Sequence, residues 1–114
     1  MNKENQFNRD VEYYLLREIA SRSACTQVEL AEKIGVSVGK VNYVLSALVQ
    51  KGIVKMEKFK QSKSKKGYLY LLTPDGIKEK KLITLNFIKR KMKEYERLEE
   101  EIGKARQEIG EEVA

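Results

Sequence analysis

Residues 26–72 constrain the fold most, because the spacing of their apolar residues changes once along this stretch and glycines separate the regularly spaced runs. Two short runs have apolar residues three or four positions apart, which is the period of a helix, and Gly35 separates them. After Gly52 the spacing becomes two, which is typical of a strand, and a second alternating run follows a lysine-rich stretch. This order predicts two short helices joined by a tight turn and followed by a β-hairpin.

Polar residues and glycines predict the ends of the two helices. Thr26 and Glu29 have the spacing of a capping box, and Ser37 is expected to cap the second helix. Gly35 and Gly52 are expected to end the first and the second helix. The expected buried faces are Val28, Leu30, Ala31 and Ile34 on the first helix and Val38, Val41, Leu45 and Leu48 on the second.

Helical periodicity also precedes this region. A helix is expected over residues 9–21, with an apolar stripe formed by Val11, Tyr14, Leu15 and Ile19. Residues 1–8 are polar without periodicity, so we expect a flexible N-terminal arm. In the hairpin, strands are expected at 53–59 and 68–72, with a charged loop over 60–66 between them.

A long helix is expected after the hairpin. Thr73 is placed to cap it, Pro74 suits its first position, and Asp75 complements the helix dipole. Its apolar residues follow a heptad-like spacing with one three-residue irregularity, which predicts a seam for a second helix. The expected dimer interface consists of Leu85, Ile88, Met92, Tyr95, Leu98 and Ile102.

These elements predict a mainly α chain with a small β-hairpin, an α+β arrangement known as a winged helix-turn-helix followed by one long helix. The expected organisation is an arm over 1–8, a DNA-binding domain over 9–72, a dimerisation helix over 73–110 and a tail over 111–114. The 114 residues and the 41% hydrophobic share are enough for one such domain with one long extra element.

Charge is distributed unevenly along the chain, whose formal net charge is +6. Residues 1–37 are nearly neutral, whereas residues 38–66 hold eight basic groups and one acid, Glu57. Residues 67–93 are also basic, and residues 94–114 are acidic. A basic middle with an acidic end predicts one surface that faces a polyanion such as nucleic acid.

Residues on the second helix of the pair are candidates for reading DNA. Asn pairs with adenine, Lys reaches guanine or phosphate, and Gly allows close approach of the backbone. The alternative is a solvated helix face, but the absence of glutamate from the expected exposed side favours DNA. The candidate contacts on this helix are Ser37, Gly39, Lys40, Asn42, Tyr43 and Ser46.

Lysines gather at the expected tip of the hairpin, with small polar residues between them. This composition suits contact with phosphate or the minor groove better than base-specific reading. A charged loop that only maintains solubility is the alternative. The candidate wing contacts are Lys58, Lys60, Lys63, Lys65 and Lys66.

Other classes of function find little support in the composition. The chain has no histidine, and we find no phosphate-binding loop, dinucleotide fingerprint or nucleophile motif, so we expect no enzyme and no cofactor or metal. The single cysteine, Cys25, excludes an internal disulfide, and an inert packed thiol is favoured over a redox sensor. No stretch resembles a signal peptide or a membrane span, so we expect a cytoplasmic protein.

Three stretches carry a resemblance to a known family: VSVGKVNYVLSALVQKGIVK (36–55), YLYLLTPDGIKEK (68–80) and FIKRKMKEYERLEEEI (87–102). The segment from Leu15 to about Ile102 resembles the short MarR-like winged-helix regulators associated with exopolysaccharide gene clusters. The resemblance implies a prokaryotic transcriptional regulator that binds duplex DNA as a homodimer. It assigns base and phosphate contacts to Ser37, Lys40, Asn42 and Tyr43, and wing contacts to Lys63, Lys65 and Lys66.

MarR-type proteins typically dimerise through an N-terminal helix together with two C-terminal helices. Only one C-terminal helix is expected here, so a small-molecule effector is not indicated. We therefore expect a sequence-specific, homodimeric regulator with helix 38–51 in the major groove and wing 58–67 on phosphate or the minor groove. The alternative is a winged-helix interaction module whose long helix forms a coiled coil with another protein.

Overall fold

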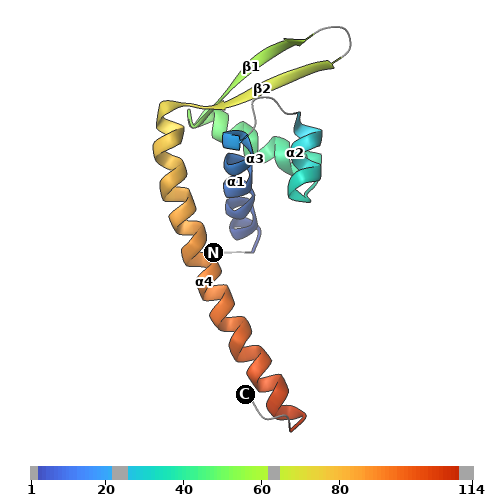
Figure 1. Ribbon diagram of the computed structural model, residues 1–114, viewed down its shortest axis with the longest axis vertical. Coiled ribbons are helices and arrows are strands. Elements are labelled where there is room, and N and C mark those ends of the chain that lie inside the picture. The colour runs from blue at the N-terminus through green and yellow to red at the C-terminus, as the bar shows by residue number, and fades with distance from the viewer. Residues whose placement is uncertain (1–2, 22–25, 62–64, 111–114) are drawn as a thin grey trace. The chain divides into compact units, whose positions relative to one another are not determined.

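A computed structural model describes residues 3–21, 26–61 and 65–110 (Figure 1). For residues 58–61 and 65–69 it describes the backbone alone, and Cys25 and Lys63 lie outside the described residues. The elements are α1 (Lys3–Ser21), α2 (Gln27–Ile34), α3 (Val38–Gln50), β1 (Val54–Gln61), β2 (Lys65–Leu72) and α4 (Pro74–Glu108). The described residues up to Thr84 form one compact unit, and those from Leu85 onward form another.

The turn between α2 and α3 forms as its polar residues predict. The Thr26 hydroxyl accepts a hydrogen bond from the Glu29 amide at 3.1 Å, and the Ser37 hydroxyl accepts one from the Lys40 amide at 3.0 Å. Between the helices, Gly35 adopts φ 84°, a left-handed conformation that favours glycine, and its amide donates to Ala31. These contacts are all local, which explains why the sequence predicts them.

Three helices and the base of the hairpin share one hydrophobic core. From α1, Leu15 and Leu16 are fully buried, and from β2, Tyr70 is 2% exposed. The partly buried Ile83 shows that the first turns of α4 also pack against this core. The buried apolar residues are Val11, Leu15, Leu16, Ile19, Leu30, Ala31, Val41, Val44, Leu45, Leu48, Ile53, Val54 and Tyr70.

Two valines that we expected in this core are exposed instead. Val28 is 53% exposed, because it lies two residues before Leu30 and so points to the opposite side of a helix that turns about 100° per residue. Val38 is 42% exposed, because it occupies the first position of α3 at the edge of the buried stripe. Val44, which was not included in the expected face, is buried there.

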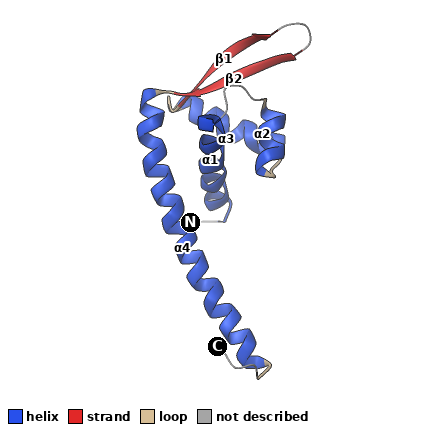
Figure 2. Ribbon diagram, viewed as in Figure 1, coloured by secondary structure: helices blue, strands red, loops and turns tan. Residues whose placement is uncertain are grey.

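The hairpin strands are longer than expected. β1 and β2 pair antiparallel from Val54 opposite Leu72 to Gln61 opposite Lys65 (red arrows in Figure 2). The charged loop expected over 60–66 is therefore wrong at both ends, because Lys60 pairs with Lys66 within the ladder. Backbone hydrogen bonding along the ladder extends strands whose side chains alone do not favour strand structure.

The first helix begins earlier than expected, at Lys3 instead of residue 9, so the described part of the expected arm over residues 1–8 is helical. Glu4, Phe7 and Asn8 have helical spacing and share one face of α1. All three lie near the ammonium group of Lys40 on α3. A tertiary contact 32 residues away in sequence thus accompanies two helical turns that composition alone does not predict.

The start of α4 is tied to the end of the helix-turn-helix at one carbonyl. The Ile53 carbonyl accepts a hydrogen bond from the Thr73 amide at 3.1 Å. The Thr73 hydroxyl caps α4 by accepting a hydrogen bond from the Gly76 amide at 2.9 Å. The same hydroxyl lies beside the carbonyls of Gly52 and Ile53. Gly76 is buried against this junction. A Cβ on Gly76 would lie 2.0 Å from the Ile53 oxygen, so only glycine fits.

Gly76→Ala is therefore expected to destabilise the protein, although alanine favours helix. The added methyl group would displace backbone, at an expected cost of about 1–3 kcal/mol in the free energy of unfolding. Urea denaturation at one fixed protein concentration would measure the loss.

Gly103→Ala provides the matched control in the same helix, because nothing lies within 4 Å of its added Cβ. Helix propensity then acts alone, and we expect stabilisation of up to about 1 kcal/mol. Equal effects of the two substitutions would contradict the close approach at Gly76.

Candidate nucleic-acid interface

The core divides α3 into a buried face and an exposed face. Val41, Val44, Leu45 and Leu48 point into the core. The opposite side of the helix presents Gly39, Asn42, Tyr43, Ser46 and Gln50, all of which are exposed. Tyr43 is the most prominent of the large apolar groups here, with 65% exposure. No residue of α3 is acidic, so this face offers hydrogen-bonding groups to a polyanion without a repelling charge.

Gln50 belongs to this face but was not among the expected contacts. It follows Ser46 by four positions and Tyr43 by seven, which is the spacing of one helix face. That spacing is visible in the sequence and would have identified it. Ser37, by contrast, uses its hydroxyl to cap α3.

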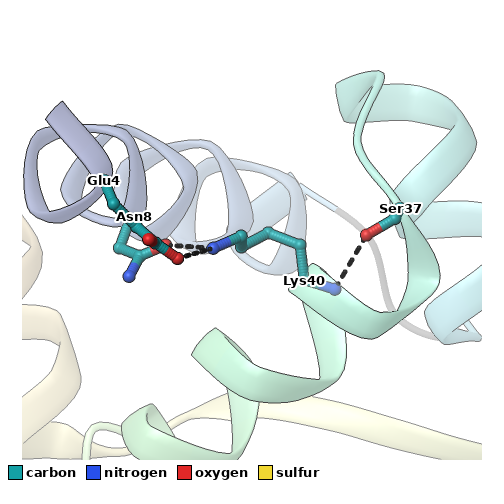
Figure 3. Close-up of polar contacts among 4 residues, drawn as sticks. All are labelled: Glu4, Asn8, Ser37 and Lys40. Atoms are coloured by element: carbon teal, nitrogen blue, oxygen red, sulfur yellow. Dashed lines mark hydrogen bonds and ion pairs between the residues drawn. The ribbon is translucent and has the colours of Figure 1, made fainter.

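Lys40 does not lie on the exposed face, where we expected it. Its side chain is 19% exposed and turns toward α1, as Figure 3 shows. The Lys40 Nζ donates to Asn8 Oδ1 at 2.7 Å and lies 3.5 Å from Glu4 Oε1. The same ammonium lies 5.6 Å from the centre of the Phe7 ring and 5.7 Å from that of Tyr43. Cation–π attraction and hydrogen bonds therefore act together on this group.

Asn42 is held on the other flank of the helix. Its Nδ2 donates to Gln27 Oε1 at 3.3 Å, and Gln27 Nε2 donates to the Tyr70 hydroxyl at 3.4 Å. This chain of contacts links the exposed face of α3 to the start of α2 and to β2. Gln27 was not predicted, because its role depends on tertiary proximity to both partners.

The wing lysines are placed by the hairpin backbone. Lys58 and Lys60 lie on β1, and Lys65 and Lys66 lie on β2, while Lys63 lies outside the described residues. On β1, Lys58 and Lys60 alternate with Phe59 and Gln61, whereas Lys65 and Lys66 are consecutive at the start of β2.

A second exposed feature lies on α4. Leu85, Ile88, Met92, Tyr95, Leu98 and Ile102 are between 43% and 60% exposed. A hydrogen bond to the Glu99 carboxylate, together with its negative charge, raises the pKa of Tyr95 above its usual value. The phenol therefore keeps its proton, and the seam carries no charge at that position.

The described part of the chain offers no centre for metal chemistry. In residues 3–21, 26–61 and 65–110, no group of three or more His, Cys, Asp or Glu side chains is placed to hold a metal ion. None of the helices in the same ranges is both long and apolar enough to span a bilayer.

Comparison with known proteins identifies the domain. Residues 13–55 match a family described as winged helix-turn-helix DNA-binding. No curated protein sequence matches the chain.

Solved structures share the architecture over most of the chain. A PadR-like transcriptional regulator from Bacillus cereus matches with a TM-score of 0.64 and 17% identity, over 76% of this chain and 89% of that one. Staphylococcus aureus MarR in complex with salicylate and kanamycin matches with a TM-score of 0.53 and 19% identity, over 84% and 67%. A mutant Escherichia coli MarR complexed with operator DNA matches with a TM-score of 0.53 and 24% identity, over 69% and 64%.

At these identities the similarity concerns the fold alone. The family match covers the helices that build the exposed face of α3, and the structural matches extend into the region of the hairpin and α4. Residues 13–55 thus match a winged helix-turn-helix DNA-binding family, and the fold over most of the chain is similar to that of MarR and PadR-like proteins.

Proposed function

We propose that this protein is a sequence-specific regulator of transcription that binds duplex DNA as a homodimer. The observation that carries the proposal is the exposed face of α3, which is polar, free of acidic residues and built on a rigid core. An α-helix of this kind fits the major groove, which is about 12 Å wide. A mutant MarR of similar fold is complexed with operator DNA, which supports the binding of duplex DNA.

Different residues of α3 would make different contacts. Gly39 allows the first turn to approach the DNA backbone, and the capped N-terminus at Ser37 directs amides toward phosphate. Asn42, Ser46 and Gln50 supply hydrogen-bonding groups for base edges, and Tyr43 supplies an aromatic surface for a thymine methyl group or a phosphate. Sequence preference would arise from these side chains.

The wing would bind without reading sequence. Lys58, Lys60, Lys63, Lys65 and Lys66 are closely spaced around the hairpin, and lysine is a point charge that suits phosphate. Their contribution to affinity would fall as salt rises, because counterions compete for the same phosphates.

Two copies would pair through the apolar face of α4 and place two α3 helices on one DNA site. Its six exposed seam residues follow helical spacing and leave apolar surface for a partner to cover. One winged helix binds weakly by itself, and two joined copies gain from effective concentration. A seam of this kind also supports the alternative function, in which α4 forms a coiled coil with a different protein.

Substitutions on the two DNA-facing elements are expected to behave differently. Asn42→Ala with Ser46→Ala should reduce discrimination between a selected duplex and a mixed-sequence duplex by about 1–3 kcal/mol. Replacing Lys63, Lys65 and Lys66 with Gln should weaken binding to both duplexes alike. The slope of log affinity against log salt concentration (the salt slope) should fall in magnitude by about 0.9 per lost phosphate contact. Binding measured by anisotropy at several salt concentrations would test both expectations.

Asn86→Ala is the control, because Asn86 is an exposed asparagine on α4 that is not among the expected DNA contacts. It should leave discrimination unchanged. An affinity for DNA that did not change with salt concentration would contradict the proposed contacts between the wing lysines and phosphate.

Self-association is expected to depend on the seam. Met92→Glu would place a charge in the apolar contact and should turn a dimer into a monomer at micromolar concentration in sedimentation equilibrium. Asn86→Glu introduces the same charge outside the seam and should leave the dimer intact. A wild-type chain that was monomeric and did not bind DNA would favour the coiled coil with another protein.

A further inference from the structure

The apolar seam of α4 is symmetric about Tyr95. Counting from that residue, apolar positions recur three, seven and ten residues away in both directions. The three-residue step that interrupts the heptad pattern is what produces this symmetry. The matched positions are Leu98 with Met92, Ile102 with Ile88, and Ala105 with Leu85.

Two charged blocks also lie at equal distances from Tyr95 with opposite sign, whereas the charges nearest to it, Glu94 with Glu96 and Lys93 with Arg97, have the same sign. Three consecutive basic residues, Lys89, Arg90 and Lys91, precede Tyr95 by six to four positions. Three consecutive acids, Glu99, Glu100 and Glu101, follow it by four to six positions. A two-fold axis through Tyr95 would therefore place the basic block of one copy alongside the acidic block of the other. Lys89 and Lys91 would flank the seam beside the acids, while Arg90 and Glu100 lie on the far sides of their helices. Parallel pairing in register would place cation beside cation and acid beside acid.

We propose that two copies of this chain pair through α4 in antiparallel orientation, with the two Tyr95 residues at the two-fold axis. A two-fold interface requires that residue i contact residue j while j contacts i, and the pattern about Tyr95 meets that requirement. This proposal rests on the proposed homodimer and specifies its geometry.

The local chemistry around Tyr95 agrees with this arrangement. Glu99 follows Tyr95 by four positions on the same helix, and its carboxylate raises the pKa of the Tyr95 phenol, so an acceptor is at hand for the hydroxyl when the ring is covered. Lys91 lies 3.2 Å from Glu94 of the same helix, and both side chains are partly exposed. Pairing would bring the partner's acidic block toward the same cation, so its charge would be neutralised from two sides.

Single-cysteine variants distinguish the two orientations. In a Cys25→Ser background, which removes the only native thiol, Ile88→Cys and Ile102→Cys are prepared as separate proteins of different tag mass. Antiparallel pairing predicts that neither protein forms a disulfide dimer alone and that the mixture forms a mixed disulfide. Disulfide dimers in each separate protein, with no preference for the mixed one, would overturn the proposal.

Charge reversal provides an independent test. Reversing the basic block (K89E, R90E, K91E) and reversing the acidic block (E99K, E100K, E101K) should each weaken self-association at least about tenfold, because the two blocks that flank the seam then carry the same charge and repel each other. Mixing the two variants should restore association as a heterodimer, with circular dichroism confirming that both remain helical. Failure of the mixture to associate would contradict the matched blocks.

These outcomes separate the geometry from the function. A dimer that binds DNA but crosslinks in parallel overturns the antiparallel pairing alone. A wild-type monomer overturns the homodimer and the antiparallel pairing together, whereas an antiparallel dimer that fails to bind any duplex refutes DNA binding only.

Lys40 supports a second inference from different observations. Two of its N–H groups face acceptors on α1, and one of these acceptors is the carboxylate of Glu4. A phosphate that contacted Lys40 would have to displace both, and the nearby carboxylate would oppose its approach. We propose that Asn8 and Glu4 are positioning residues that withhold the Lys40 ammonium from DNA, which again rests on the proposed function.

The salt dependence of binding to a mixed-sequence duplex tests this role. Lys40→Ala in the wild type should leave the salt slope unchanged, whereas Asn8→Ala with Glu4→Gln should raise affinity about three- to tenfold and the slope by about 0.9. Lys40→Ala added to that double variant should remove the gain. Asp10→Asn is the control, because it removes one acidic charge from α1 two residues after Asn8, on another side of the helix.

A DNA-free measurement keeps the two hypotheses separate. Asn8→Ala and Lys40→Ala should show non-additive effects on thermal stability, because they interrupt one contact. If the stability effects are non-additive but no variant binds DNA, the proposed function is refuted. The proposed role of Asn8 and Glu4 in keeping Lys40 from DNA is then refuted with it. If Lys40→Ala in the wild type lowers the magnitude of the salt slope by about 0.9, Lys40 contacts phosphate directly. That result would overturn the proposed role of Asn8 and Glu4 and leave the proposed function standing.

Discussion

The carbonyl of Ile53 is the point at which the parts of the domain are joined. It follows the glycine that ends α3, directly precedes β1, accepts the amide of Thr73 after β2, and lies against Gly76 in the first turn of α4. Four elements therefore meet around one backbone group. A buried carbonyl needs its hydrogen bond, so the ends of the hairpin cannot separate without a cost. The direction of α3, the base of the wing and the first turn of α4 all depend on this junction.

The buried face of α3 explains how the domain presents its polar face. Val41, Val44, Leu45 and Leu48 anchor the helix against α1 and the hairpin, so the residues on the other side are displayed on a rigid support. A reading surface needs such support, because side chains on a mobile segment lose affinity to ordering costs. Near this surface, Lys40 is drawn into contacts with Asn8 and Glu4 of α1.

Much of this structure is predictable from the sequence, because its determinants are local. Caps at Thr26, Ser37 and Thr73 act across three residues, and Gly35 ends a helix through its own backbone conformation. The change from helical to alternating spacing after Gly52 likewise reports which residues face a core. The exposure of Asn42, Tyr43 and Ser46 follows from the position of the buried stripe. For the wing lysines and the seam of α4, their roles in binding and pairing stay predictions.

The sequence by itself determined the kinds of element, their order and most of their ends, since those depend on residues within one or two turns of each other. Only the tertiary structure decided that α1 extends to Lys3 and that Lys40 turns away from the exposed face. It also decided that Gln27 joins Asn42 to Tyr70. Those outcomes require groups that are 15 to 43 residues apart to meet, and no local pattern encodes such a meeting. The free energy of each contact is small, so the packing of the core determines which of them form.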